Sequence, residues 1–113
     1  MNCLFCKIAA GEIPTKLIYE DDKIVAFNDI APQAPHHILI IPRKHIATIN
    51  DVSSDDTLLL GQMMQIGKKI AAELKIAENG YRLLMNCNQQ GGQAVYHIHF
   101  HLLGGRQMQW PPG

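Results

Sequence analysis

The sequence has neither a net charge nor a long apolar run. Its 113 residues include ten Lys plus Arg and ten Asp plus Glu, so no overall field attracts nucleic acid or an anionic membrane. No apolar run is longer than that at residues 38–41, which is far short of the roughly 20 residues that span a bilayer. The first residues also lack the basic and then apolar segments of a signal peptide. We therefore expect a cytoplasmic protein that binds neither nucleic acid nor membranes.

Cysteine is scarce as well. Three cysteines cannot all pair within one chain, which argues against a secreted disulfide framework. Cys3 and Cys6 form a Cys-x-x-Cys pair, but a thioredoxin-like redox site needs a β-α-β setting that the first ten residues cannot provide. Two free thiols, or half of a tetrahedral zinc site, remain as alternatives. Cys87 lies in an apolar run and is predicted to be a buried thiol.

The composition is that of one globular domain. With 47% hydrophobic and 18% charged residues, the chain can bury a core, and its length allows a single domain over residues 1–113. Residues 4–11 predict a short helix, and a long amphipathic helix follows Ser53, the predicted N-cap. The apolar face of the long helix consists of Leu59, Met63, Ile66, Ile70 and Leu74. Five strands are predicted, at residues 16–19, 23–28, 37–42, 81–88 and 95–103. This order, without regular β-α alternation, favours an α+β fold with a mainly antiparallel sheet.

Three histidines alternate in the last predicted strand. Because successive side chains of a strand point to opposite faces, His97, His99 and His101 are predicted to share one face. An unprotonated imidazole is a nucleophile and its neighbour is a proton donor, so the row suits phosphoryl transfer through a covalent histidine. A metallohydrolase in which these histidines bind zinc is the alternative. The chain has no P-loop, which leaves a kinase unsupported.

The segment QQGGQA at residues 89–94 enters this strand. Its unhindered backbone N–H groups are able to form an anion-binding nest beside the histidines, or the glycines merely serve a hairpin turn.

The run HIHFHLL at residues 97–103 resembles the motif His-φ-His-φ-His-φ-φ of the histidine triad (HIT) family, where φ is apolar. The segments 11–14 (GEIP), 29–35 (DIAPQAP), 41–45 (IPRKH) and 104–113 (GGRQMQWPPG) are similar to the Hint branch of that family. The resemblance implies a HIT-like fold with one long and one short helix, and a homodimer whose sheets join. It also implies hydrolysis of purine nucleoside phosphoramidates that carry AMP or GMP, with aminoacyl-adenylates as further substrates.

The resemblance assigns catalytic roles to four histidines. His99 attacks the α-phosphorus and forms a nucleotidyl-histidine that water cleaves, which is covalent catalysis in two displacements. His101 contacts the phosphate, His37 orients the nucleophilic ring through a relay, and His97 is structural or a metal ligand. Asp29 binds the ribose hydroxyls, because a carboxylate accepts two hydrogen bonds. The nucleotide-binding residues implied in this way are Leu4, Phe5, Ile8, Ile13, Phe27, Asp29, Ile30, Asn86, Gly92, Ala94, Val95, His99 and His101.

Some relatives complete the Cys-x-x-Cys pair with two histidines. Here these are His45 and His97, which with Cys3 and Cys6 imply a structural zinc site and no catalytic metal. Many Hint proteins have Ser where this chain has Ala94, so the loss of that hydroxyl is expected to affect protonation of the leaving group.

Two other functions stay open. A non-catalytic purine nucleotide sensor or interaction module is compatible with Ala94. A dinucleoside polyphosphate hydrolase would follow the Fhit-type branch, although the tail that begins at Gly104 is more similar to Hint proteins.

Overall fold

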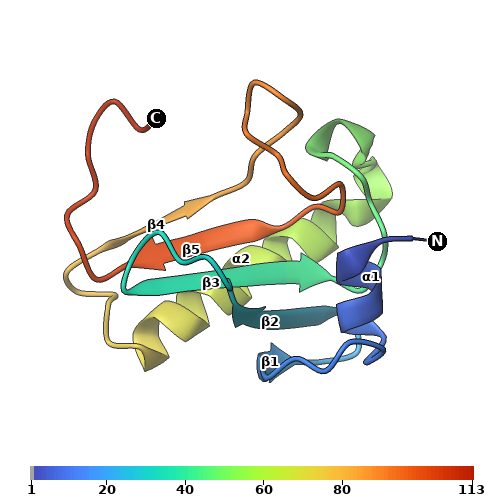
Figure 1. Cartoon of the computed structure of the whole chain (residues 1–113), viewed down its shortest axis with the longest axis horizontal. Coiled ribbons are helices and arrows are strands. Elements are labelled where there is room, and N and C mark those ends of the chain that lie inside the picture. The colour runs from blue at the N-terminus through green and yellow to red at the C-terminus, as the bar shows by residue number, and fades with distance from the viewer. Residues whose placement is uncertain (1) are drawn as a thin grey trace.

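Five strands form one antiparallel sheet in the computed structural model, which describes residues 2–113 (Figure 1). The strands lie in the order β1-β2-β3-β5-β4. Their bounds are Leu17–Glu20 (β1), Ile24–Asn28 (β2), His36–Pro42 (β3), Tyr81–Leu84 (β4) and Phe100–Gly104 (β5). The predicted α+β architecture is therefore confirmed, with β3 at the centre of the sheet and β1 and β4 at its edges.

Alternation along the inner strands separates two apolar layers. Ile38 and Ile40 of β3 pack in one cluster with residues of α2, whereas Leu39 and Ile41 pack in a second cluster with residues of α1. Side chains two apart on a strand point to the same face, so a strand of continuous apolar residues supplies both layers. The predicted hairpin is also present, because β1 and β2 pair antiparallel.

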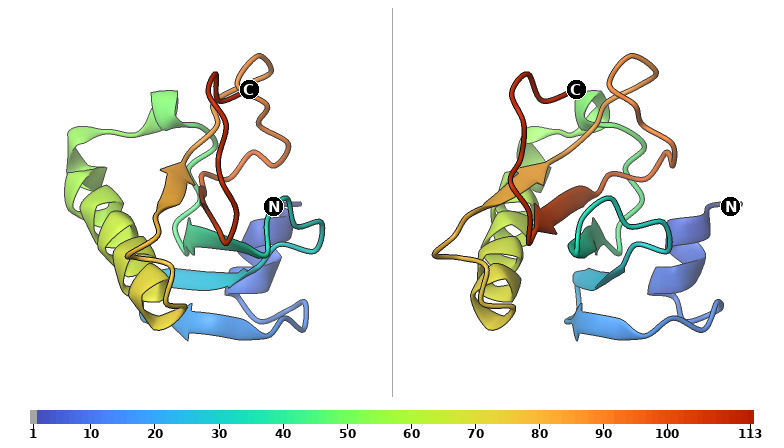
Figure 2. Two further views of the ribbon diagram at one scale, coloured as in Figure 1. Left: turned by 90° about the vertical axis from the view of Figure 1, so that its left-hand side faces the viewer. Right: turned by 60° about the vertical axis from the view of Figure 1, so that its left-hand side comes forward.

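Helix α2 (Thr57–Glu73) covers one face of the sheet, as Figure 2 shows. Its predicted apolar face is confirmed, since Met63 and Ile70 are fully buried and the other members pack against the same cluster. Two short 3₁₀ helices, Ile49–Asp51 and Ser54–Asp56, precede it. The prediction that Ser53 is the N-cap of the long helix is wrong. The Ser53 hydroxyl accepts a hydrogen bond from the backbone N–H of Asp55 and caps the second 3₁₀ helix, which precedes α2.

Helix α1 (Leu4–Ala9) lies on the opposite face of the sheet (Figure 2). Its residues Phe5, Ile8 and Ala9 are buried and pack against β2 and β3. The guanidinium of Arg43, just after β3, donates to the carbonyl of Ala9 and to that of Asp21. Apolar packing and these charged hydrogen bonds fix α1 over the sheet end at which the histidines lie.

The predicted strand at residues 95–103 is wrong in its first half, because β5 begins only at Phe100. The β3–β5 register pairs Ile40 with Phe100, so a longer ladder would pair Ile41 with His99 and then Pro42 with Ile98. Proline has no backbone N–H and cannot continue the ladder as a donor. The N–H of Ile98 donates instead to the carbonyl of Ile46, at 2.8 Å. The first two histidines of the triad therefore lie on an irregular segment.

Strand β4 is also shorter than the predicted 81–88, since it ends at Leu84 opposite His101 of β5. The partner strand β5 begins at Phe100, one residue before His101, so residues 86–88 would have no strand residue to pair with. Cys87, in the segment that follows, is half-buried and not the buried thiol expected from the sequence.

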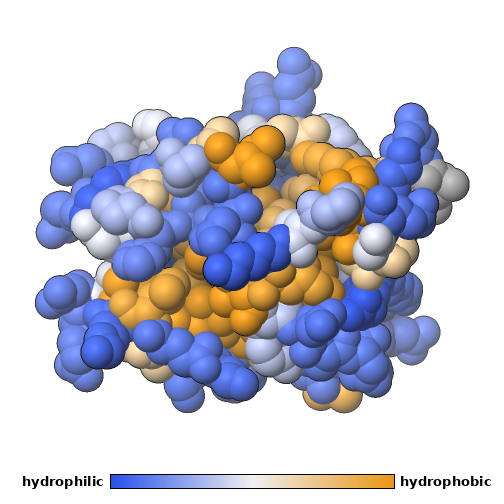
Figure 3. All heavy atoms as spheres, turned by 60° about the horizontal axis from the view of Figure 1, so that its bottom comes forward, coloured by the Kyte–Doolittle hydropathy of each residue, from blue (hydrophilic) through white to orange (hydrophobic). Residues whose placement is uncertain are grey.

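Hydrophobic side chains form a band across the face shown in Figure 3. The large hydrophobic residues that are most exposed include Leu4 (49%), Ile30 (101%), Leu58 (70%), Met64 (52%) and Trp110 (83%). Over residues 2–113, none of the helices combines the length and apolarity that crossing a membrane requires.

Two glycines of α2 provide a matched test of the packing. A Cβ atom at Gly67 would lie 3.2 Å from side-chain atoms of Ile40 and Leu83, whereas a Cβ at Gly61 would meet nothing within 4 Å. We expect Gly67→Val to lower the free energy of unfolding by about 1–3 kcal/mol through overpacking. Gly61→Val should change it by less than about 0.5 kcal/mol, because valine and glycine differ little in helix propensity. Urea unfolding measures both, and equal effects would contradict the packing described.

Candidate functional site

A cavity of about 450 Å³ opens between α1, the loop that follows β2, and the segment that leads into β5. Its wall is mostly apolar, and His99 and His101 contribute its polar side chains together with Asp29, Asn28 and Thr15. Such a mostly apolar pocket with a few convergent polar groups is typical of small-molecule sites. The remaining lining residues are Leu4, Phe5, Ile8, Ile13, Pro14, Phe27, Ile30, Leu39, Ala94 and Val95.

The cavity brings together all of the predicted nucleotide-binding residues except Asn86 and Gly92, which do not line it among the residues described. The roles of these two residues stay predictions. Four lining residues were missed by the sequence analysis: Pro14, Thr15, Asn28 and Leu39. Sequence signals existed for three of them, since Pro14 and Asn28 adjoin predicted lining residues and Leu39 is two residues from His37 on a strand.

His99 is buried at 5% exposure and held in one orientation. Its Nδ1 lies 2.8 Å from the backbone carbonyl oxygen of His97, and a carbonyl only accepts, so Nδ1 carries the proton. In the neutral ring Nε2 then has a free lone pair. The ring of Phe5 packs against the imidazole edge-to-face, with centroids 5.1 Å apart. The geometry therefore holds an unprotonated nitrogen in a fixed ring on the cavity wall.

A second pair of histidines forms a relay beside it. The backbone N–H of Gln33 donates to Nδ1 of His37 at 3.0 Å, so a neutral His37 carries its proton on Nε2. That nitrogen lies 2.8 Å from Nδ1 of His101 and donates to it. His101 then carries its own proton on Nε2, the buried side-chain atom that has no hydrogen-bond partner over residues 2–113. The relay contacts His101 and not His99, whose ring is oriented by the His97 carbonyl.

Burial keeps these imidazoles neutral. It is the largest cause that lowers the pKa of His37 and of His99, because a charged ring loses hydration there. Burial also lowers the pKa of His101 to about 4, with the neighbouring His99 and His37 as further causes. Near neutral pH the site thus contains uncharged rings whose protons are placed by hydrogen bonds.

Asp29 lies at the rim of the same group. Its Oδ2 is 3.4 Å from Nε2 of His37, and together with His101 these residues could be read as a metal site. The two ring nitrogens, however, are only 2.8 Å apart, which is the length of a hydrogen bond with a proton between them. We therefore interpret the trio as a proton relay with a carboxylate beside it.

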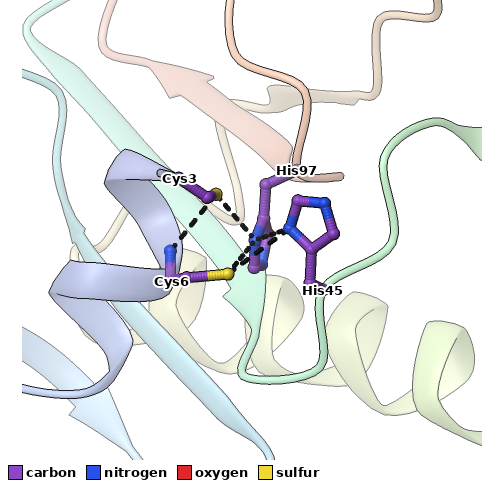
Figure 4. A group of neighbouring side chains, drawn as sticks. All are labelled: Cys3, Cys6, His45 and His97. Atoms are coloured by element: carbon purple, nitrogen blue, oxygen red, sulfur yellow. Dashed lines mark hydrogen bonds between the residues drawn. The ribbon is translucent and has the colours of Figure 1, made fainter. Parts of the chain in front are cut away.

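The first triad histidine belongs to a different cluster, in which Cys3, Cys6, His45 and His97 converge from α1, the loop after β3 and the segment before β5 (Figure 4). Nδ1 of His97 lies 3.4 Å from Sγ of Cys3 and 3.5 Å from Sγ of Cys6. Nδ1 of His45 lies 3.4 Å from Sγ of Cys6 and 3.2 Å from Nδ1 of His97. These four residues could therefore hold a metal ion.

The distances fit a tetrahedral ion. With metal–sulfur bonds near 2.3 Å and metal–nitrogen bonds near 2.0–2.1 Å, ligand atoms of a zinc tetrahedron lie about 3.3–3.8 Å apart. His97 is prepared for this role, because its Nε2–H donates to the carbonyl of Pro42 at 2.7 Å and leaves Nδ1 as the free donor atom. Burial, followed by the contact with Cys3, raises the pKa of the Cys6 thiol, so a bound metal would have to displace that proton.

Gln93 supports the loop that carries Ala94 and Val95, and the sequence analysis missed it. Its side-chain amide donates to the carbonyls of Ala47 and Val95, and its carbonyl oxygen accepts from the N–H of Asn88. It is buried at 7% exposure with these groups satisfied. No periodic signal marks such a residue, because its partners lie in distant parts of the chain.

The HIT domain family matches residues 10–108 of the chain. The purine nucleoside phosphoramidase of Escherichia coli strain K12 is 56% identical to it over 105 residues, which cover 93% of this chain and 88% of that protein.

Solved structures agree with this match. A HIT family hydrolase from Legionella pneumophila superposes with a TM-score of 0.97 at 63% identity, covering 99% of this chain and 100% of that one. A histidine triad nucleotide-binding protein from Candida albicans superposes with a TM-score of 0.83 at 37% identity, covering 97% and 83%. The protein with this triad, this sheet order and this cavity is a member of the HIT family.

Proposed function

We propose that this protein, as a single HIT domain over residues 1–113, hydrolyses purine nucleoside phosphoramidates through His99. The observation that carries the proposal is the hydrogen bond from Nδ1–H of His99 to the His97 carbonyl. It leaves Nε2 as an unprotonated nucleophile on the wall of a cavity large enough for a nucleotide. The similarity to the Escherichia coli purine nucleoside phosphoramidase supports the same substrate class.

The reaction would proceed in two displacements. Nε2 of His99 attacks phosphorus, the P–N bond of the substrate breaks, and the amine leaves with a proton, so that a nucleotidyl-histidine forms. Water then attacks the same phosphorus, the bond to Nε2 breaks, and the nucleoside monophosphate and neutral His99 are released. Splitting one difficult step into two is the gain of covalent catalysis.

His101 would act as the hydrogen-bond donor to the phosphoryl group. Its Nε2–H is buried beside the nucleophile without a partner over the residues described, and a ligand oxygen would satisfy it. The ring is held by His37, so the donor is oriented before substrate binds. His37 would therefore act on His101, and through it on the reacting group.

The nucleoside would occupy the apolar part of the cavity. The base would lie against aliphatic and aromatic side chains of α1 and β2, and Asp29 would accept hydrogen bonds from the ribose hydroxyls. Ala94 lines the cavity, is exposed and offers no hydroxyl to a leaving group. The proton for the amine would then come from the histidines or from water.

We further propose that the Cys3, Cys6, His45 and His97 cluster binds a structural zinc ion. The ligand spacing and the mixed thiolate and imidazole donors support zinc over harder cations. The ion would fix α1, which carries the cavity residues Leu4, Phe5 and Ile8, to the sheet. Free thiols of this kind persist in a reducing compartment, which supports a cytoplasmic location.

The protein is also proposed to be a homodimer whose sheets join at β4. This strand is an edge of the sheet, its four residues are half-buried rather than exposed, and charged residues there are limited to Arg82. Unprotected strand edges invite pairing with another strand, and a second copy would satisfy them.

His99→Ala should abolish turnover of an adenosine phosphoramidate, with a loss in kcat of about 10⁴-fold or more, as for nucleophiles elsewhere. The circular dichroism spectrum should stay unchanged. His36→Ala is the matched control, because His36 lies beside the site on β3 but outside the cavity lining. Full activity in His99→Ala would refute the proposal, and tight AMP binding without turnover in the unaltered protein would favour a nucleotide sensor.

Purified protein should contain one zinc ion per chain, measured by inductively coupled plasma mass spectrometry. A chelator should remove the ion and lower the melting temperature, because the metal ties α1 to the sheet. Cys6→Ser should lose the metal, whereas Cys87→Ser should keep it, since Cys87 lies outside the cluster. Equal zinc content in the two variants would exclude the site.

Light scattering should give the mass of two chains in solution. Amide hydrogen exchange then compares the two sheet edges, Tyr81–Leu84 (β4) and Leu17–Glu20 (β1). Slower exchange at β4 is expected, because pairing with a second copy protects its outward N–H groups. A monomeric mass would contradict the proposed assembly.

A further inference from the structure

The carboxylate of Asp29 lies next to the ring of His37 and also lines the cavity. Asp29 follows β2, where its backbone N–H donates to the carbonyl of His37 at 2.9 Å and its Oδ1 accepts from the N–H of Ala31 at 2.8 Å. These bonds fix the residue beside β3. The second oxygen, Oδ2, lies 3.4 Å from Nε2 of His37. The Asp29 side chain is 19% exposed and that of His37 is 4% exposed, so the carboxylate stands between the buried ring and the cavity.

The nitrogen that faces Asp29 is the one that donates within the relay. Nε2 of His37 lies 2.8 Å from Nδ1 of His101, and the N–H of Gln33 occupies the other nitrogen of the His37 ring. A negative charge next to Nε2 favours the tautomer with the proton on that atom. The same tautomer leaves the proton of His101 on Nε2, where the phosphoryl group is proposed to bind.

No other charged side chain on the described cavity wall offsets the negative charge of Asp29. Among the lining residues that the structure describes, Asp29 is the only Asp, Glu, Lys or Arg. The titratable groups that face the His37 and His101 pair are Asp29 and His99, while β2 and α1 contribute no charged side chain to the cavity. Burial lowers the pKa of His37, and the charge of Asp29 opposes that effect. The carboxylate is thus the main electrostatic support of the relay.

We propose that Asp29 is a positioning residue of the His37–His101 relay in addition to a ribose ligand. The inference rests on the proposed function and adds a coupling to it, because one carboxylate would serve both nucleoside recognition and the proton donor. The carboxylate would keep the relay proton on Nε2 of His37, so that the Nε2–H of His101 stays directed at the phosphoryl group while the same side chain binds the sugar.

The test compares Asp29→Asn with the unaltered protein on two substrates, an adenosine phosphoramidate and its 2′,3′-dideoxy analogue. A carboxylate that only binds ribose would affect KM for the first substrate and nothing for the second. With the coupling, kcat for the dideoxy analogue also falls about tenfold, less than the roughly 10²–10⁴-fold that a general acid or base itself contributes, because Asp29 acts through His37. The acid limb of the kcat profile should move to lower pH, because loss of the carboxylate lowers the pKa of the pair. Asp22→Asn, which removes the same charge from an exposed turn, is the matched control.

Unchanged kcat and an unchanged pH profile on the dideoxy analogue would overturn the inference while leaving the proposed function intact. Full activity of His99→Ala would instead overturn the proposed function, so the two failures are distinguishable. Nitrogen-15 chemical shifts of the His37 ring give a readout that needs no turnover. They should report the proton on Nε2 in all three proteins at neutral pH, because the N–H of Gln33 fixes the tautomer, and a titration of the His37 ring at lower pH in Asp29→Asn or in Asp29→Ser, because the carboxylate charge is lost. Identical titrations in all three proteins would also reject the role of Asp29.

Discussion

The backbone carbonyl of His97 is the group on which the arrangement of the site depends. It accepts the Nδ1–H of His99, while the His97 side chain, one bond away, is turned into the cluster of thiols and imidazoles. One residue therefore holds the ring of its neighbour with its main chain and joins α1 to the sheet with its side chain. The helix fixed in this way carries Phe5 between the two cysteines, and Phe5 packs on the ring of His99. The cluster of Cys3, Cys6, His45 and His97, helix α1 and the cavity wall are thus joined around the ring of His99.

The buried histidines are divided among distinct tasks by backbone groups rather than by their own chemistry. All are the same side chain, but carbonyls of Pro42 and His97 and the N–H of Gln33 decide which ring nitrogen carries the proton. Burial makes this assignment matter, because an imidazole in the interior is uncharged and a wrong tautomer would leave a polar atom unpaired. The exception is Nε2 of His101, which has no partner over residues 2–113 and faces the place where a ligand would bind.

Sequence periodicity predicted the scaffold well where strands and helices are regular. The central strand, the hairpin and the apolar face of α2 follow from local alternation and helical spacing, and the structure confirms them. The prediction that one strand carries all three triad histidines was wrong, and the reason is nonlocal. Pro42, more than fifty residues away in sequence, interrupts the ladder, and Ile98 bonds to the loop after β3 instead. The irregular segment places His97 in the cluster with Cys3 and Cys6, and His99 on the wall of the cavity.

The sequence by itself determined the family, the apolar layers and the set of chemical groups, since these depend on residue identity and on short-range spacing. Only the tertiary structure decided which groups meet. That His37 bonds to His101 and not to His99, that Asp29 stands beside the relay, and that Gln93 braces the cavity loop all depend on contacts between residues far apart in the chain. Hydrogen bonds are directional and act over about 3 Å, so partners and tautomers are settled by the folded geometry, which no local pattern encodes.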